Sequence, residues 1–285
     1  MHIVVTGAGG NVGRHVVAEL LSRGHEVAGV DRVGRPDYVA DGVLSWTVGD
    51  VGDPELMAGV MAAARPDALI HLAAIPRPSL GTPLEVFATN TQATFVALET
   101  AGDAGVGRVA IASSTSAYGM VFAVRPVSPL YAPVDEAHPF VGSDPYALSK
   151  QVDEATAATM HRRHGYQVVA LRISNTSPMA DQITRAADAA EHPDELARQL
   201  WAYLDARDAA RAFALAVERD LPGRHVINVM APDSISPERT AALMTRFHPT
   251  TERRRPLVGR EVPYDLTRAH DLLGFEAEYL LPRNR

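Results

Sequence analysis

The sequence predicts an α/β fold, in which a doubly wound parallel sheet carries a small C-terminal lobe. Three observations predict it. Short apolar runs alternate with helical patterns in the first half of the chain, and these runs contain almost no polar positions. A glycine-rich turn joins the first run to the first helix. Strands that are apolar throughout are typical of a sheet covered by helices on both faces. The 285 residues suffice for one such unit with an appended lobe.

The elements are assigned in chain order from these patterns. Strands are expected over 3–6, 26–30, 68–72, 108–112 and 167–173, with another just before residue 50. Helices are expected over 11–23, 54–64, 83–104 and 144–164. A Pro-rich, loop-like stretch covers 113–142. Beyond residue 173 the pattern weakens, and it predicts helices near 193–200, 207–218, 237–247 and 266–273 with a short strand at 225–229.

Composition limits the partners and the compartment. The net charge is −7, and acids and bases alternate along the chain, so no broad basic surface is available for nucleic acid. The chain has no cysteine, which rules out disulfides and thiolate metal sites, and we expect no metal. No leader pattern follows Met1, and no apolar run approaches the roughly 18 residues that a membrane span requires. We expect a cytoplasmic protein with no nucleic-acid or membrane partner.

The turn after the first strand has the features of a dinucleotide site. Gly7, Gly10 and Gly13 fall three apart, and Asn11 and Val12 open the helix. Glycines at this junction let the backbone turn tightly and approach a pyrophosphate, whose charge meets the N–H groups of the helix N-terminus. The alternative is a glycine-rich turn without a ligand, but the strand-turn-helix context favours the binding site.

Asp31 follows the second strand, about 20 residues beyond the glycines, where a carboxylate accepts hydrogen bonds from an adenosine ribose. This position favours NAD, because a carboxylate there repels the 2′-phosphate of NADP. Arg32 and Arg35 leave NADP possible, since a guanidinium near the ribose attracts that phosphate.

Two further segments end parallel strands at the edge where open α/β sheets bind ligands. Asp50 and Val51 follow the third strand, and Leu72, Ala73 and Ala74 follow the fourth. We therefore place them beside the adenine and ribose. The small alanines are also compatible with a tight loop that has no room for larger side chains.

Tyr146 and Lys150 are four residues apart, so both project from one face of a helix. A free phenol has a pKa near 10, and a nearby cation favours the phenolate, which can then act as a base. The alternative is an ordinary amphipathic helix. A cluster of hydroxyls, Ser113, Ser114 and Thr115, lies just past the fifth strand on the same side of the sheet. One of them is placed to hold a substrate oxygen that exchanges its proton with Tyr146; a hydrogen-bonded polar turn is the other reading.

Taken together, these motifs resemble those of the extended short-chain dehydrogenases/reductases, a family that includes sugar-nucleotide epimerases and dehydratases. The matching pieces are TGxxGxxG at 6–13, GDV at 49–51, HLAA at 71–74, Asn90, SS at 113–114 before YG at 118–119, YxxxK at 146–150, LR at 171–172 with Asn175, 205–212, and LLGF at 272–275. The resemblance covers nearly the whole chain.

This resemblance implies a Rossmann-type NAD(P)-binding domain over 1–173. A small substrate-binding lobe follows over 174–285, with part of its chain returning to the core. It also implies a homodimer formed through the helices 83–104 and 144–164.

The resemblance also implies roles for single residues. Tyr146 is the acid/base, and Lys150 orients the nicotinamide ribose and favours the phenolate. Ser114 binds the substrate oxygen, because the family's hydroxyl lies four residues before the tyrosine of the Tyr-Gly pair, here Tyr118. The remaining expected neighbours are Asn90 and Ile173 for the cofactor, and Thr115 and Asn175 for the substrate.

The segment between Asn175 and Asp205 is shorter than in most sugar-nucleotide members of the family, which implies a smaller polar substrate. In this respect the chain resembles uronate dehydrogenases, and we expect an NAD(P)-dependent oxidoreductase that transfers a hydride at a carbinol carbon of a sugar, a sugar acid or another small polar substrate. A nucleotide-sugar epimerase or dehydratase with tightly bound NAD is the first alternative. A non-catalytic dinucleotide sensor is the second, although such sensors tend to lose the Tyr/Lys pair that is present here.

Overall fold

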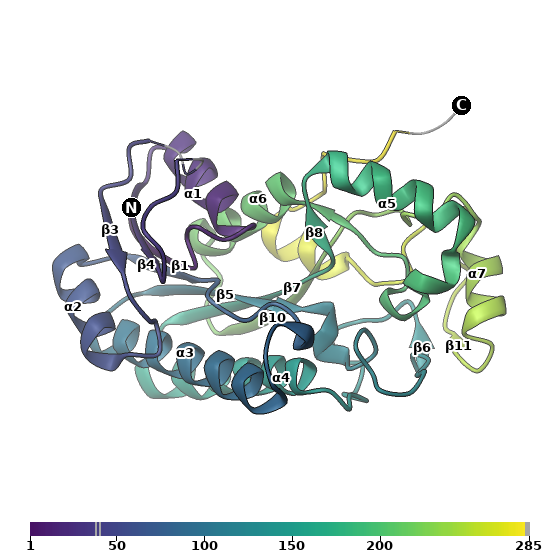
Figure 1. Cartoon of the computed structure of the whole chain (residues 1–285), viewed down its shortest axis with the longest axis horizontal. Coiled ribbons are helices and arrows are strands. Elements are labelled where there is room, and N and C mark those ends of the chain that lie inside the picture. Colours follow the sequence, from purple (N-terminus) through teal and green to yellow (C-terminus); the bar gives the residue numbers. More distant parts are fainter. Residues whose placement is uncertain (38, 40, 283–285) are drawn as a thin grey trace.

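A parallel sheet of seven strands runs through the centre of the computed structural model, which describes residues 1–37, 39 and 41–282 (Figure 1). The strands are β1 (His2–Thr6), β2 (Glu26–Asp31), β3 (Ser45–Val48), β4 (Ala68–His71), β5 (Arg108–Ser114), β7 (Gln167–Ile173) and β10 (Arg224–Val229). Their order across the sheet is β10-β7-β5-β4-β1-β2-β3. The chain thus winds outward from β1 in both directions, which confirms the predicted doubly wound α/β fold.

Helices cover both faces of this sheet. On one face lie α1 (Gly13–Ser22) and α6 (Ala206–Glu218), and on the other lie α2 (Pro54–Ala64), α3 (Pro83–Asp103) and α4 (Pro145–His164) (Figure 1). Successive side chains of β1 alternate between the two cores: Ile3 and Val5 pack in the first, and Val4 packs in the second. Both faces of the strand are buried, which explains the continuous apolar runs in the sequence.

Side-chain caps fix where the helices of the second face begin. Asp53 accepts hydrogen bonds from the backbone of the first turn of α2, Thr82 forms a reciprocal capping box at α3, and Asp144 caps α4. Each cap is followed by a proline at the first helical position, where a missing N–H costs nothing. The cap of α4 fixes where this helix begins, and Tyr146 lies in its first turn.

A second, smaller core lies beside the carboxyl ends of the strands. Its elements are η2 (Thr115–Tyr118), β6 (Tyr131–Ala132), β8 (Thr176–Ser177), α5 (Met179–Glu191), η3 (Pro193–Gln199), β9 (Leu204–Asp205), α7 (Thr240–Phe247) and β11 (Glu252–Arg253). Trp201 and Tyr203 are fully buried at its centre, together with Tyr118 and Met120 from the first half of the chain. The stretch after β5 that was expected to be loop-like therefore supplies part of this core.

The two halves of the chain exchange elements. α6 and β10 return from the second half to the sheet, where β10 pairs with β7 as an edge strand. In the opposite direction β6 leaves the first half and pairs with β11. The division at residue 173 into a nucleotide-binding domain and a substrate lobe stays a prediction. No helix within the described ranges has the length and apolarity to cross a membrane.

Several predicted elements need correction. α5 was not expected at all, and the segment 193–200 forms a 3-10 helix, η3, in place of an α-helix. The last predicted helix, 266–273, is helical over residues 267–273, but its residues from Ala269 onward form a π-helical turn, η4 (Ala269–Leu273). The helix predicted from residue 237 begins at Thr240, and η1 (Pro78–Leu80) is an additional short 3-10 turn before α3.

Candidate active site

The glycine turn between β1 and α1 packs directly on the loop after β4. Gly7 has a positive φ of 66°, and a Cβ there would lie 2.8 Å from the backbone nitrogen of Ala73. A Cβ on Gly13 would collide with the carbonyl oxygen of Gly7 and with Ala8. The spacing of the glycines therefore follows from close backbone packing, and it leaves the N-terminus of α1 uncapped by any side chain of the described residues.

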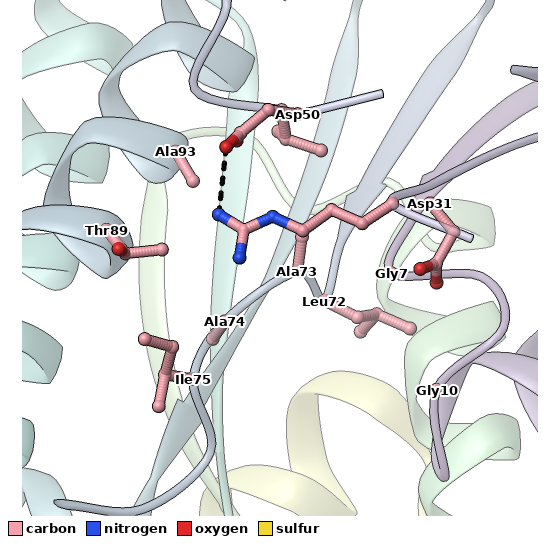
Figure 2. A pocket seen from close by; sticks show the side chains of 12 residues that line it. Gly7, Gly10, Asp31, Asp50, Leu72, Ala73, Ala74, Ile75, Thr89 and Ala93 are labelled. Carbon is pink, nitrogen blue, oxygen red and sulfur yellow. Dashed lines mark hydrogen bonds and ion pairs between the residues drawn. The ribbon is translucent and has the colours of Figure 1, made fainter. Parts of the chain in front are cut away.

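Beside this turn lies a pocket of about 220 Å³ at the carboxyl edge of the sheet (Figure 2). Nine of the predicted cofactor residues line it: Gly7, Gly10, Asp31, Arg32, Asp50, Val51, Leu72, Ala73 and Ala74. Ile75, Thr89 and Ala93 complete the lining and were not predicted. Five segments that are separate in the sequence thus meet around a single cavity.

Asp31 and Asp50 both line this cavity, Asp31 at the end of β2 and Asp50 shortly after β3 (Figure 2). One oxygen of Asp31, Oδ2, accepts a 2.9 Å hydrogen bond from the backbone N–H of Gly9, which fixes the carboxylate at the end of β2. Arg32 turns the other way and donates to Asp50 at 2.9 Å, the contact drawn as a dashed line in Figure 2. The pocket therefore presents the Asp31 carboxylate, while the Arg32 guanidinium beside it is already paired with Asp50.

Other predicted cofactor residues lie outside the lining of this pocket. Asn11 donates to the carbonyl of Thr176 at 3.2 Å, and Val12 is the N-cap residue of α1. Asn90 is fully buried on α3, where its amide exchanges hydrogen bonds with the backbone of Ile75 and donates to Ser149. Asn90 therefore stabilises the loop after β4 that lines the pocket, and it links this loop to Ser149 of α4.

Tyr146 and Lys150 lie on one face of α4, as the sequence indicated. Tyr146 is 7% exposed, and the ammonium of Lys150 lies 5.8 Å from the centroid of its ring. The ring of Phe122 meets the Tyr146 ring edge to face at 5.8 Å between centroids. The phenol is thus enclosed between a cation and an aromatic wall, which limits its access to water.

The ammonium of Lys150 is itself buried and held by two acceptors. It donates to the carbonyl oxygen of Ala112 at 2.9 Å and to the carboxylate of Asp153 at 3.1 Å. Burial lowers the pKa of Lys150, but the carboxylate of Asp153, with smaller contributions from Tyr146 and Glu154, raises it above its ordinary value. Lys150 therefore stays charged beside the phenol.

The two adjacent serines at the end of β5 have different surroundings. The hydroxyl of Ser113 is buried and donates at 2.6 Å to Glu154, which also receives two hydrogen bonds from Arg172. Ser114 is half-buried, and its hydroxyl accepts a hydrogen bond from the backbone of Ser116, so its own proton remains available. Thr115 is buried in the same turn. This arrangement favours Ser114 over Ser113 as the hydroxyl that meets a substrate.

The last two predicted neighbours lie at the end of β7. Ile173 pairs in register with Ser114 of β5, which places it at the same edge of the sheet. Asn175 follows, and its backbone carbonyl accepts hydrogen bonds from Leu204 and from the buried Gln182 of α5. The backbone of Asn175 is therefore fixed by the second lobe.

Sequence reasoning missed Asp153, Phe122 and the buried His71 at the end of β4. His71 lies between two hydroxyls, with Nδ1 at 2.8 Å from Thr6 and Nε2 at 3.2 Å from Thr94. Burial, together with the charge of Lys150, lowers its pKa to about 3, so the ring is neutral. The signal for Asp153 was present in the sequence, since a carboxylate three residues after Lys150 lies on the same helix face.

The described residues fit a bound dinucleotide. The N-terminus of α1 has no side-chain cap within the described ranges, so its N–H groups can meet a pyrophosphate, and the cavity beside the turn has a carboxylate fixed at the end of β2. Lys150 has a third N–H beyond the two that donate to Ala112 and Asp153.

The chain is similar to curated UDP-glucose 4-epimerases. It is 29% identical to the enzyme of Lacticaseibacillus casei over 62% of this chain and 52% of the relative, and 31% identical to that of Erwinia amylovora over 61% and 53%. The chain spans about half the length of the curated relatives it matches.

Solved structures match over almost their full length. The UDP-glucose 4-epimerase of Thermotoga maritima with UDP-glucose aligns with a TM-score of 0.72 at 23% identity, covering 98% of this chain and 94% of that one. MoeE5 in complex with UDP-glucose and NAD aligns with a TM-score of 0.71 at 26% identity, covering 99% and 95%. These likenesses confirm the Rossmann-type fold.

The family assignment comes from the sequence itself. The family model described as "NAD dependent epimerase/dehydratase family" matches residues 3–229, which include the glycine turn, the Tyr146–Lys150 pair and β10. The resemblance to extended short-chain dehydrogenases/reductases is thereby confirmed, and with it NAD as the cofactor of the family. The chain belongs to the NAD-dependent epimerase/dehydratase family.

Proposed function

We propose that this protein is an NAD-dependent epimerase of a nucleotide-linked sugar, in which a carbinol carbon is oxidised and then reduced within one active site. The observation that carries the proposal is the Tyr146–Lys150 pair, enclosed on α4 and held to β5 through Ala112, the strand whose end carries Ser114, in the same sheet as the pocket that nine of the predicted cofactor residues line. The Tyr146–Lys150 pair, the Ser114 hydroxyl and the pocket are thus carried by elements of the same sheet and its helices. A non-catalytic sensor would not need this enclosed pair.

In this proposal Tyr146 moves the proton of the reacting hydroxyl. The ammonium of Lys150 favours the phenolate, which accepts that proton while the hydride leaves the same carbon. Ser114 donates to the substrate oxygen and keeps it within reach of the phenol. When the direction reverses, Tyr146 returns the proton to the same oxygen, so no proton needs to enter from solvent.

The cofactor-binding residues hold the dinucleotide along the sheet edge. Gly7, Gly10 and the N-terminus of α1 meet the pyrophosphate, and Asp31 accepts from the adenosine ribose. Lys150 donates to a hydroxyl of the other ribose. When bound, NAD supplies the hydride acceptor and donor.

The choice of epimerisation over net oxidation is supported by the relatives and by the second lobe. Those relatives are epimerases, and the solved epimerase structures are matched almost end to end. The segment between Asn175 and Asp205, expected to be too short for a nucleotide pocket, folds into α5 and η3, which carry Arg185 and Arg198. These cations are suited to a diphosphate, although Arg198 also donates to the carbonyl of Ala123.

A second candidate is a dehydrogenase that oxidises a smaller sugar or sugar acid with net formation of NADH. The short segment after Asn175 favours it, because few residues are available to surround a nucleotide. Tyr146, Lys150 and Ser114 would have the same roles. The two candidates differ in whether the reduced cofactor remains and returns its hydride to the opposite face of the oxidised carbon, which inverts the configuration.

One experiment separates them. The purified protein is incubated with NAD and, in parallel, with UDP-glucose, UDP-glucuronate and free uronates, while NADH absorbance and sugar stereochemistry by NMR are followed together. A change of configuration without accumulation of NADH supports the epimerase. NADH formed in proportion to the oxidised sugar supports the dehydrogenase and rejects the epimerase. If neither occurs with a broad panel of nucleotide and free sugars, both candidates are wrong.

A further inference from the structure

We infer that Asp153 is a positioning residue for Lys150: its carboxylate keeps the buried side chain an ammonium and leaves one N–H aimed at the cofactor site. This inference rests on the proposed function, since it concerns the same Lys150. Asp153 is 1% exposed and Lys150 is 4% exposed, so neither charge has water to stabilise it. Their 3.1 Å contact is the one ion pair that Lys150 makes among the described residues.

Asp153 helps to fix the orientation of the Lys150 ammonium. An ammonium has three N–H groups and no acceptor. In Lys150 one N–H is directed to the carbonyl of Ala112 and a second to Asp153, two acceptors that come from β5 and from α4. The rotation of the ammonium is thereby fixed, and the third N–H points away from both. Without Asp153, a single acceptor would leave the ammonium free to rotate.

A row of polar contacts runs from Thr6, at the end of β1, to Asp153, and each donor in it has a defined direction. The hydroxyl oxygen of Thr6 accepts from the backbone N–H groups of Leu72 at 3.2 Å and Ala73 at 3.4 Å, which occupies both lone pairs, so its proton is directed to Nδ1 of His71. Since His71 is neutral, its one N–H is then on Nε2 and donates to Thr94. This assignment leaves the Thr94 proton for another acceptor.

That acceptor is Asp153, whose carboxylate interacts with the Thr94 side chain. The contact is looser than a full hydrogen bond, because Oδ1 of Asp153 has no hydrogen-bond partner among the described residues. Burial raises the pKa of Asp153, and the charge of Lys150 and then the Thr94 hydroxyl oppose that rise. The row therefore connects the loop that lines the cofactor pocket to the counter-ion of Lys150, through α3.

The other charged groups around Lys150 do not replace Asp153. On α4, the carboxylate of Glu154 is engaged by Arg172 of β7 with hydrogen bonds of 2.7 and 2.8 Å, so its charge is largely neutralised. On β4, His71 is neutral, and Tyr146 is the group that the ammonium itself acts on. Removing the charge of Asp153 thus leaves a buried lysine without an effective counter-ion, and such a lysine loses its proton readily.

The test uses Asp153→Asn, which keeps the shape and removes the charge, and two readouts that need no sugar substrate. The first is NAD affinity by calorimetry between about pH 7 and about pH 10. In the wild type it should stay level, because Lys150 remains charged. In Asp153→Asn it should fall about tenfold as pH rises, because the neutral amine donates a weaker hydrogen bond to the ribose.

The second readout is the pH at which Tyr146 ionises, followed by phenolate absorbance of the protein without cofactor. The chain has eight tyrosines, so the titration of Tyr146→Phe is subtracted in each background. In Asp153→Asn the ionisation of Tyr146 should move to higher pH, because the phenolate loses its neighbouring cation. A merely structural role of Asp153 would lower the melting temperature without moving this midpoint.

Glu154→Gln is the matched control. It removes a buried carboxylate from the next position of the same helix, and it should destabilise the fold while leaving NAD affinity independent of pH. If Asp153→Asn shows neither the fall in affinity nor the shift of Tyr146, the inference is overturned. If the wild type does not bind NAD, the proposed function fails, and the Tyr146 titration alone still decides the role of Asp153.

Discussion

Arg32 donates to Asp50 at 2.9 Å in the pocket that Asp31 also lines. A guanidinium close to Asp31 would have favoured NADP, and this one is paired with a different carboxylate. Both partners of that pair are more than half exposed, so the contact itself contributes little to stability. Its importance is that it holds the Arg32 guanidinium at Asp50 instead of at Asp31.

We predict that Asp31→Asn narrows the preference for NAD over NADP. The amide still accepts from the N–H of Gly9, so the turn keeps its shape, but the charge that repels a 2′-phosphate is gone. NAD binding should weaken about tenfold, as expected when a charged acceptor is lost, and NADP binding should weaken less or improve. Calorimetric titration with both nucleotides measures this. An unchanged ratio would mean that Asp31 does not face the ribose.

Tyr146→Phe should reduce turnover by on the order of a hundredfold or more, because positioned proton transfer contributes this much. The ring still packs against Phe122, so NAD affinity should change little. Lys150→Met is the contrasting variant, since it should weaken both NAD binding and turnover. Steady-state kinetics and calorimetry on the two variants distinguish these roles. Retention of most activity by Tyr146→Phe on a confirmed substrate would assign the proton transfer to another group.

Gly13→Ala should destabilise the fold by roughly 1–3 kcal/mol, because the added methyl meets backbone that cannot move aside. Gly59→Ala is the control. Gly59 is an exposed residue within α2 and has open space around it, so alanine there should stabilise by about 0.5–1 kcal/mol. Thermal unfolding of both variants gives opposite signs. Equal effects would show that the close packing of the turn does not matter.

Buried His71 should make stability depend on pH in the acidic range. Its pKa is lowered to about 3 in the folded protein, while in the unfolded chain it takes its ordinary value of 6.5. The unfolded state therefore binds the additional proton as pH falls below 6.5, and folding loses up to about 1.4 kcal/mol per pH unit until the folded pKa is reached. Above pH 6.5 this effect is absent.

Denaturant unfolding at several pH values, compared with His71→Asn, measures that contribution. The variant loses the packing of the ring at every pH, but its stability should fall less steeply between pH 6.5 and about pH 4. Parallel slopes for the two proteins would rule out the assignment of a neutral, proton-resistant ring at this position.

α3 and α4 lie side by side on one face of the sheet and expose large apolar side chains, among them Phe95 at 51% and Leu148 at 45% (Figure 1). We predict that this surface forms the homodimer, because exposed apolar groups on adjacent helices mark an interface. Phe95→Glu should convert the dimer to a monomer in light scattering. Val258→Glu, which changes a more exposed apolar residue outside these helices, should leave it dimeric. A monomeric wild type would refute this interface.

The sheet could be predicted from the sequence because its strands are buried on both faces, which leaves a continuous apolar signal. α5 could not. Its buried residues are the small Ala189 and the polar Gln182, which donates to two backbone carbonyls, while Ile183 is 47% exposed. One buried polar position and one exposed large apolar position thus weaken the apolar periodicity of this helix, and the two carbonyls that receive the Gln182 amide are brought to it only by the fold.

Some residues of the candidate site could likewise be predicted from the sequence, and others could not. Close backbone packing requires glycine at Gly7 and Gly13, and helix spacing places Tyr146 and Lys150 on one face. All four could therefore be identified in the sequence. Asp153 has the same spacing as an ordinary surface ion pair of a helix, and nothing local in the sequence indicates that α3 and β4 bury it.

The pairing of β6 with β11, together with the return of β10 to the sheet, limits how this protein can be redesigned. A chimera that replaced residues 174–285 with the same region of a relative would have to pair β6 and β7 with strands of foreign sequence, and a poor match would leave β7 as an unpaired edge. Tyr118 and Met120 would lose the side chains that bury them. Substrate specificity is therefore not a transferable module in this chain, and any exchange of it must include the segment after β5.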